Sequence, residues 1–129
     1  MRTIIYDQDV KAIDLTNPLP VVNGYNANDS FNATLSTPDA RTAQVIKTAT
    51  SGKSIYVTDL VISAAVADNI RIQDSTATAV VHMSPIYLEA GTSIAINFST
   101  PLKITASKDL KVKATVVGNV TVTATGFVA

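Results

Sequence analysis

Residues 110–125 of the chain read LKVKATVVGNVTVTAT, and this stretch decides the class of fold. Apolar side chains alternate with lysine and threonine up to residue 116, and the alternation returns at residue 120 after Gly118-Asn119. Successive side chains of a strand point to opposite faces, so this pattern predicts two strands, each with a buried and a wet face. Glycine and asparagine favour a turn between them.

The same alternation extends back along the chain to residue 44. It is clearest in residues 70–73, 94–98 and 102–107. Within residues 55–62 it changes phase, which predicts either a β-bulge or a strand buried on both faces. The pattern therefore indicates a domain made of strands.

Turn residues separate these runs about every 8–12 residues, a rhythm typical of an antiparallel sandwich or barrel. Ser84-Pro85 and Thr100-Pro101 are among the turn signals. The one helix candidate is residues 39–49, and the β-branched residues in its second half favour a strand there. We expect an all-β protein, with an antiparallel β-sandwich over residues 43–129.

Residues 1–42 follow a different pattern, which predicts an extended N-terminal arm. They contain Pro18, Pro20 and Pro38, and no apolar period persists for more than a few residues. Proline lacks an amide hydrogen and biases the residue before it toward extended geometry. Two short strands are predicted within the arm, at residues 3–6 and 19–22. A segment this long is unusual as a plain loop within a domain.

The composition excludes several classes of protein. Charged residues make up 16% of the chain, against about 25% in typical soluble domains, and ten basic residues balance ten acidic ones. With 47% apolar residues the chain is not disordered, and without net positive charge it is not a general nucleic-acid binder. The absence of cysteine excludes disulfides and thiolate metal sites.

The charges that are present are segregated along the chain. Five aspartates outnumber the basic residues of the predicted arm, whereas the last third is locally basic. Its lysines are Lys103, Lys108, Lys111 and Lys113, against Asp109 alone. These lysines form either the solvated face of two neighbouring strands or a surface for an acidic partner, such as the arm of a neighbouring subunit.

The residues offer little for catalysis. His82 is the sole histidine and Glu89 the sole glutamate of the sequence. A Ser-His-Asp relay of Ser75, His82 and Asp74 is possible by composition, but the Gly-X-Ser-X-Gly signature is missing. A histidine at a strand end or subunit contact is the simpler interpretation. We therefore expect a non-enzymatic protein with no catalytic residues, no cofactor and no metal.

Two other motifs have weak functional interpretations. Residues 50–54 resemble the end of a phosphate-binding loop, but Lys47 stands where its first glycine should be, and a strand is predicted to follow. Exposed aromatic rings could bind sugars, and the candidates are Tyr25, Tyr56 and Tyr87. Tyr56 and Tyr87 lie inside predicted strands, where we expect them to pack.

Four segments carry a resemblance to a known class of protein. They read SIYVTDLVIS at 54–63, PIYLEAGTSI at 85–94, NFSTPLK at 97–103 and VTVTATGFV at 120–128. Together they resemble small jelly-roll-like domains in virion structural proteins of tailed bacteriophages. The resemblance implies a jelly-roll form of the sandwich. It also implies a trimeric protein that decorates a capsid or forms a module of a tail or fibre.

Resemblance and composition together give the functional expectation. The chain is expected to be a structural virion protein that decorates or cements a phage capsid through self-association and arm exchange. Its expected partners are copies of itself, as a trimer, and another virion protein such as the major capsid protein, with no nucleic acid and no membrane. Since the first residues lack a signal-peptide pattern, we expect synthesis in the host cytoplasm and a final location in the virion.

The predicted partner interface combines the arm with the basic strands. The arm residues are Ile4, Ile5, Tyr6, Pro18, Leu19, Pro20, Val21 and Val22, and the basic residues are Lys103, Lys108, Lys111 and Lys113. Two alternatives stay open. One is a tail or fibre module that contacts a host-surface glycan, and the other is a free-standing esterase-like or lectin-like domain that uses His82.

Overall fold

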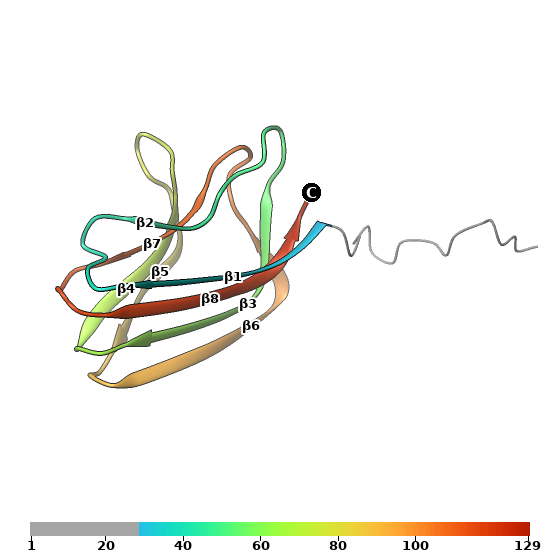
Figure 1. Cartoon of the computed structure of the whole chain (residues 1–129). Helices are drawn as coiled ribbons and strands as arrows, with labels where there is room; N and C mark the ends of the chain where they lie inside the picture. The colour runs from blue at the N-terminus through green and yellow to red at the C-terminus, as the bar shows by residue number, and fades with distance from the viewer. Residues whose placement is uncertain (1–28) are drawn as a thin grey trace, which may run out of the picture.

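The computed structural model describes residues 29–129, which form two antiparallel four-stranded sheets packed face to face (Figure 1). The predicted all-β sandwich is confirmed, and no residue from 30 to 129 is helical. The strands are β1 (Ser30–Thr37), β2 (Gln44–Lys47), β3 (Ile55–Ala64), β4 (Asp68–Asp74), β5 (Val81–Leu88), β6 (Thr92–Lys103), β7 (Leu110–Ala114) and β8 (Val120–Val128).

The pairing of the strands is nested, as in a jelly roll. One sheet has the order β1-β8-β3-β6 and the other the order β2-β7-β4-β5. The first strand pairs with the last, the second with the seventh, the third with the sixth and the fourth with the fifth. The described chain is therefore a long ribbon of strand pairs, folded at the β4–β5 connection and wrapped into two sheets.

The sandwich begins earlier than the predicted boundary at residue 43. β1 lies inside the stretch assigned to the arm, and it pairs with β8 along its whole length, from Ser30 opposite Phe127 to Thr37 opposite Val120. Its inward side chains, Phe31, Ala33 and Leu35, alternate with polar residues from Ser30 to Ser36, which is the same period-two pattern as in the later strands. The strands predicted at residues 3–6 and 19–22 lie outside the described residues.

A β-bulge explains the change of phase in β3. Ile55 and Val57 are buried, and after an irregularity between Val57 and Asp59 the buried positions become Leu60 and Ile62. The extra residue lets β3 keep one apolar face toward the core. Of the two interpretations left open by the sequence, the bulge is correct.

Gly126 of β8 permits a close approach of two backbones beside this bulge. A Cβ atom at this position would lie 1.8 Å from the carbonyl oxygen of Tyr56 and 3.1 Å from Cα of Val57. Because both neighbours are backbone atoms, they cannot move without shifting β3 itself. Only glycine fits between β8 and β3 here.

Two prolines expected in turns lie within strands instead. Pro85 is inside β5 and Pro101 is near the end of β6. Both strands are at the edge of their sheets, where a residue without an amide hydrogen costs no ladder bond. The predicted strand in the second half of residues 39–49 is confirmed as β2.

The core lies between the sheets and leaves two outer faces of different character. Its largest buried side chains come from β3, β4, β7 and β8 and from Ile104. Since neighbours of buried residues point outward, each sheet presents its polar side chains to the surface. In residues 29–129 we find no helix long and apolar enough to cross a membrane.

Candidate functional site

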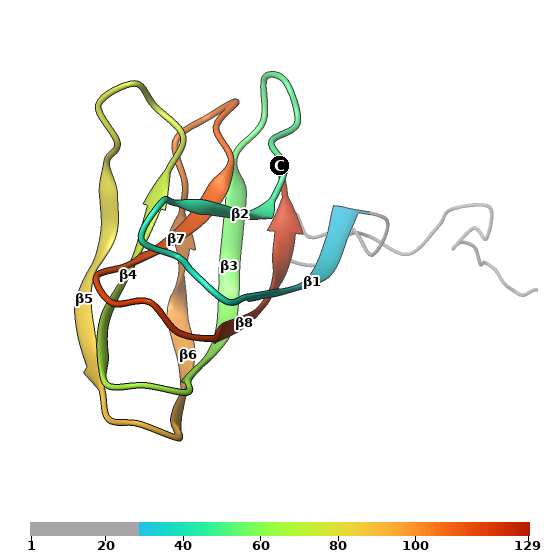
Figure 2. The same ribbon diagram turned by 60° about the vertical axis from the view of Figure 1, so that its left-hand side comes forward.

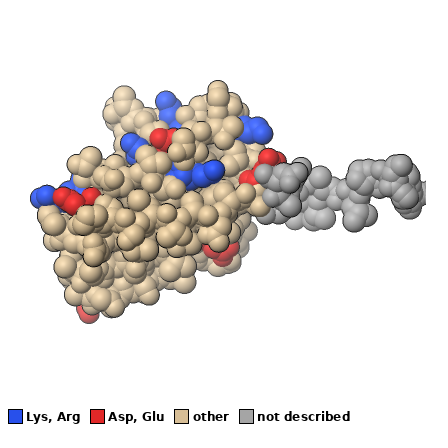
Figure 3. All heavy atoms as spheres, in the orientation of Figure 1, with Lys and Arg blue, Asp and Glu red and all other residues tan. Residues whose placement is uncertain are grey.

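The outer face of the β2-β7-β4-β5 sheet, hereafter the cationic face, gathers basic side chains from two neighbouring strands. In β7, burial of Leu110, Val112 and Ala114 turns Lys111 and Lys113 outward. The same sheet contains β4, whose residue Arg71 lies between two fully buried isoleucines and also points outward. Figure 3 shows basic atoms concentrated on the side of the molecule that carries this sheet.

The sheet register places two cations directly opposite each other. Arg71 is the antiparallel partner of Lys113, and Gln73 is the partner of Lys111. The guanidinium Nε of Arg71 donates a hydrogen bond to Oε1 of Gln73 at 2.9 Å. Among the described residues the ion pairs are Arg41–Asp39 and His82–Asp74, so no carboxylate of residues 29–129 neutralises this pair.

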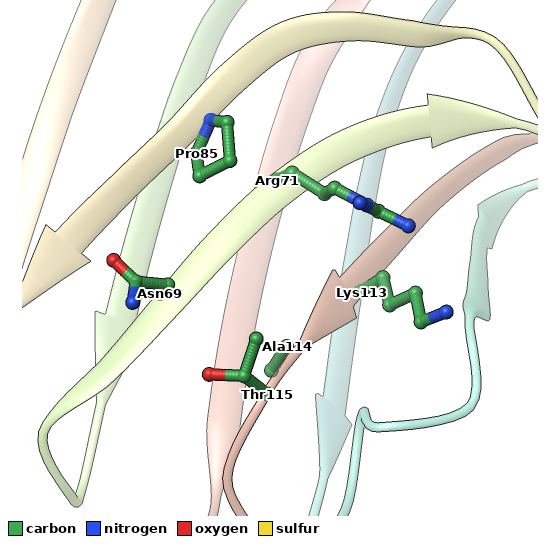
Figure 4. A pocket seen from close by; sticks show the side chains of 6 residues that line it. All are labelled: Asn69, Arg71, Pro85, Lys113, Ala114 and Thr115. Carbon is green, nitrogen blue, oxygen red and sulfur yellow. The ribbon is translucent and has the colours of Figure 1, made fainter.

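A shallow hollow of about 190 Å³ lies at this pair. It is lined by Asn69, Arg71, Pro85, Lys113, Ala114 and Thr115. Figure 4 shows the side chains of Arg71 and Lys113 extending side by side from β4 and β7, with Asn69 and Thr115 at the other end. The volume is below the ~300–1,000 Å³ of typical small-molecule pockets, so the hollow suits a carboxylate or another small anionic group.

Asp68, buried beneath this face, fixes the end of the hollow. Its Oδ1 accepts hydrogen bonds from the backbone N–H and hydroxyl of Thr115, both at 2.9 Å, and from the N–H of Val116 at 3.1 Å. The residue is 2% exposed, and its Oδ2 has no hydrogen-bond partner among residues 29–129. The bonds to Oδ1 hold the end of β7 in place beside β4.

A second polar cluster joins the loops at one end of the sandwich, where the β2–β3, β4–β5 and β6–β7 connections lie together (Figure 2). At its centre is the fully buried carboxylate of Asp74. Oδ1 accepts from the N–H and hydroxyl of Thr76 at 3.0 and 2.7 Å and from the N–H of Val80 at 3.1 Å. Oδ2 contacts Nε2 of His82 at 3.0 Å and accepts from the hydroxyl of Thr105.

These contacts lower the pKa of Asp74. Burial alone raises it, but hydrogen bonds from Thr105, Thr76 and His82 outweigh that effect and hold the pKa well below its usual range. The carboxylate therefore stays charged and joins the β4–β5 loop to the residue Thr105, which is distant in sequence.

The geometry of this cluster does not match a nucleophilic relay. In such a relay one ring nitrogen of histidine faces the carboxylate and the other faces the hydroxyl. Here the same nitrogen, Nε2 of His82, is 3.0 Å from Asp74 and 3.4 Å from the hydroxyl of Thr105. Ser75, the nucleophile considered from the sequence, instead accepts a hydrogen bond from the N–H of Asp109 at 2.8 Å.

The four predicted lysines do not form one patch. Lys111 and Lys113 share the cationic face, whereas Lys103 ends β6 in the other sheet, with its Nζ 5.9 Å from the ring centre of Tyr56. Lys108 lies in the turn between β6 and β7. The predicted arm residues, Ile4, Ile5, Tyr6, Pro18, Leu19, Pro20, Val21 and Val22, lie outside the described residues.

The tyrosines differ in their surroundings. Tyr56 packs as expected, stacked on Phe127 with ring centres 4.9 Å apart. The expectation that Tyr87 packs is wrong, because this residue is 59% exposed and lies on the cationic face opposite Asn69. Residues 50–54 form a loop that leads into β3, so no helix follows the phosphate-loop fragment.

Sequence reasoning missed Arg71 as a member of the basic surface. The alternation around it did indicate an outward side chain, but its position opposite Lys113 depends on the pairing of β4 with β7. That pairing joins residues distant in sequence, and a regular alternation fits several strand orders equally well.

Comparisons with known proteins add no assignment. No protein-family model matches the sequence, and no curated protein matches it. Within residues 29–129 no group of three or more histidine, cysteine, aspartate or glutamate side chains could hold a metal ion. The basic hollow is therefore the candidate site on geometric grounds alone.

Proposed function

We propose that the chain is a structural subunit that acts by associating with copies of itself, as a virion protein that decorates or cements a phage capsid. The observation that carries this proposal is the uneven distribution of surface charge between the two sheets. The cationic face holds basic groups without acidic partners among residues 29–129, while the opposite face is nearly uncharged.

The outer face of the β1-β8-β3-β6 sheet, hereafter the hydroxyl face, consists mainly of small uncharged side chains. Register and burial place these residues on it: Ser30, Asn32, Thr34 and Ser36 of β1, Thr121, Thr123 and Thr125 of β8, Val61 and Ser63 of β3, and Ser93, Ala95 and Asn97 of β6. Asp59 and Lys103 are the charged residues of these four strands.

Such a surface favours a covered subunit over a solitary one. Soluble domains that act alone keep charges of both signs spread over the surface, since these charges oppose association. A subunit with neighbours on several sides has less need of them. The virion assignment is supported by the resemblance to phage structural domains and by the jelly-roll topology, which viral capsid proteins often use.

The test is the oligomeric state of the full chain, followed by its presence in particles. Size-exclusion chromatography with light scattering should give a mass above that of one chain, and we expect a trimer. Mass spectrometry of purified particles should then detect the chain in many copies per particle. A monomer at every concentration, or purified particles that lack the chain, would contradict the proposal.

One observation favours a second candidate, a tail or fibre module that binds a glycan. The ring of Tyr87 is exposed on the cationic face, opposite the amide of Asn69, and an exposed aromatic ring beside a polar group can stack on a sugar. A glycan array with the full chain separates the two candidates. Binding that the substitution Tyr87→Ala abolishes would favour the glycan module.

A further inference from the structure

We propose that the basic hollow binds the carboxylates of Asp7 and Asp9 from a second copy of the chain. This inference rests on the proposed self-association and names the contact through which it occurs. The binding site is the hollow, defined by its six lining residues. The segment that binds there is residues 4–9, which lie outside the described part of the chain.

The basic charges at the hollow are arranged unfavourably. Arg71 and Lys113 are direct cross-strand partners, and like charges in that position repel each other. Asp68 is buried beneath the same face, but it bonds to Thr115 and Val116 and makes no ion pair with either cation. An anionic group bound at the hollow would relieve the repulsion.

The spacing of two acidic residues near the start of the chain suits the two cations of the hollow. Asp7 and Asp9 are the only acidic residues of the sequence separated by a single position. In an extended segment, residues two apart point to the same side at a spacing of about 6.6 Å. Cross-strand partners such as Arg71 and Lys113 have Cα atoms about 4.5–5.5 Å apart, so two such carboxylates can meet two such cations.

The same segment also has an apolar residue that the cationic face can contact. Ile5 stands at the same spacing before Asp7, so an extended segment presents it on the side of the two carboxylates. On the cationic face, the exposed ring of Tyr87 lies opposite Asn69, and Pro85 lines the hollow itself. The face therefore offers apolar contacts next to its cations, in the combination that this segment requires.

The chain between the two aspartates and the sandwich is long enough to reach a neighbouring copy. From residue 9 to residue 29 the chain has 20 residues. Fully extended, these span up to about 70 Å, several times the ~13 Å radius of gyration of a domain of this size. β1 belongs to the sheet that does not carry the hollow (Figure 1), so a segment bound to its own hollow would have to wrap around the sandwich. The hollow of a neighbouring copy can be reached by a more direct path.

The experiment measures self-association of the full chain by sedimentation equilibrium. The variants are D7N/D9N, R71Q/K113Q and the quadruple variant, with K53Q/K108Q as a control that removes two cations from the loops around Ser107, away from the hollow. We expect each of the first two variants to weaken association about tenfold, as two ion pairs of moderate strength would. The control should change it little, and thermal unfolding should show that each variant folds.

Two further outcomes decide whether the two groups meet. If Asp7 and Asp9 bind at Arg71 and Lys113, the quadruple variant should be no weaker than either double variant, because each removes the same contact. If the losses add, or if neither double variant weakens association, the inference is wrong while self-association through another surface stands. A wild-type chain that stays monomeric would overturn the proposed function as well.

A charge exchange between copies tests whether the contact is intermolecular. D7K/D9K and R71D/K113D should each associate poorly alone, because segment and hollow then carry the same sign. Mixed together with different tags, they should co-purify, since each segment now faces a hollow of opposite charge on the other variant. The intermolecular proposal would be overturned if the mixture fails to associate while a single chain that carries all four substitutions associates as the wild type does. That result would place the contact between segment and hollow within one copy.

Discussion

The hydroxyl face and the cationic face satisfy their polar side chains differently. On the hydroxyl face, neighbouring strands bond to each other: the hydroxyls of Thr34 and Thr123 are 3.3 Å apart, and the amide of Asn97 donates to Asp59 at 2.7 Å. On the cationic face, Arg71 and Lys113 stand opposite each other without an acidic partner in residues 29–129. Polar side chains of the hydroxyl face thus pair with each other across strands, whereas the two cations of the cationic face have no acidic partner on theirs.

This difference separates features that stabilise the fold from features that suit a partner. Both sheets contribute the same kind of inner surface, aliphatic side chains that are almost fully buried. The stability of the fold therefore gives no reason for the outer surfaces of the two sheets to differ in charge. An arrangement of like charges that costs stability is more informative about function than one that adds to it.

The largest expected effect comes from closing the space at Gly126, on the buried side of β8 in the sheet that carries the hydroxyl face. The substitution Gly126→Ala puts a Cβ atom against the backbone of Tyr56, and relief requires β3 and β8 to separate. We expect a loss of roughly 3 kcal/mol or more in the free energy of unfolding, because such overpacking has no flexible neighbour. Urea unfolding measures it.

Gly91 provides the matched control for that substitution. A Cβ atom there meets nothing within 4 Å, and the strain arises only from its positive φ of 72°. Gly91→Ala should therefore cost about 1 kcal/mol, clearly less than Gly126→Ala. Equal losses at the two sites would mean that the approach of β8 to β3 is looser than described.

The next largest effect is expected at Asp74, which joins the β4–β5 loop to the β6–β7 connection. Asp74→Asn removes the charge that Thr76, Thr105 and His82 contact, and we expect a loss of about 2 kcal/mol at neutral pH. Because the pKa of Asp74 is lowered in the folded chain, its contribution is complete above the unfolded value of about 4 and declines as pH falls below it.

The pH dependence supplies the check on this assignment. The difference in unfolding free energy between the wild type and the Asp74→Asn variant should narrow on acidification from neutral pH to about pH 3. A difference that stays constant with pH would mean that the charge of Asp74 does not stabilise the fold. The substitution Thr105→Val, which removes one donor, should reproduce part of the loss.

Particular residues show how far the sequence could predict these features. The alternation of residues 110–125 correctly indicated that Lys111 and Lys113 point outward, and the phase change in residues 55–62 correctly allowed a bulge. The neighbours Arg71–Lys113 and Asp74–Thr105 could not be predicted, because both depend on strand order or loop packing. Period-two patterns specify faces, and long-range contacts decide which faces meet.

A smaller effect of opposite sign is expected on the cationic face. Lys113→Glu converts a repulsive cross-strand pair with Arg71 into an attractive one. At concentrations where the chain is monomeric, we expect this variant to be more stable by about 0.5 kcal/mol while it associates less well. The measurement is urea unfolding at low and high salt, and the gain should shrink at high salt because the interaction is screened.

Lys111 provides the matched control on the same strand. Its cross-strand partners are Gln73 and Val45, so Lys111→Glu forms no ion pair there and should add less stability. If Lys111→Glu stabilises as much as Lys113→Glu, the gain reflects overall charge and not the pair with Arg71. If Lys113→Glu is destabilising, the repulsion between Arg71 and Lys113 is not a cost to the fold.

The smallest expected effect lies in the hydroxyl pair of Thr34 and Thr123. A double-mutant cycle of Thr34→Val and Thr123→Val should give a favourable coupling of about 0.3 kcal/mol, since the bond is exposed to water. The same cycle on Arg71→Gln and Lys113→Gln should give a coupling of opposite sign. The sign of the coupling matters more than its size. Each cycle compares a pair with its own single variants, so differences in burial between the two pairs cancel. If both couplings are favourable, Arg71 and Lys113 stabilise each other as Thr34 and Thr123 do. The reason to expect an acidic partner on the cationic face would then be gone.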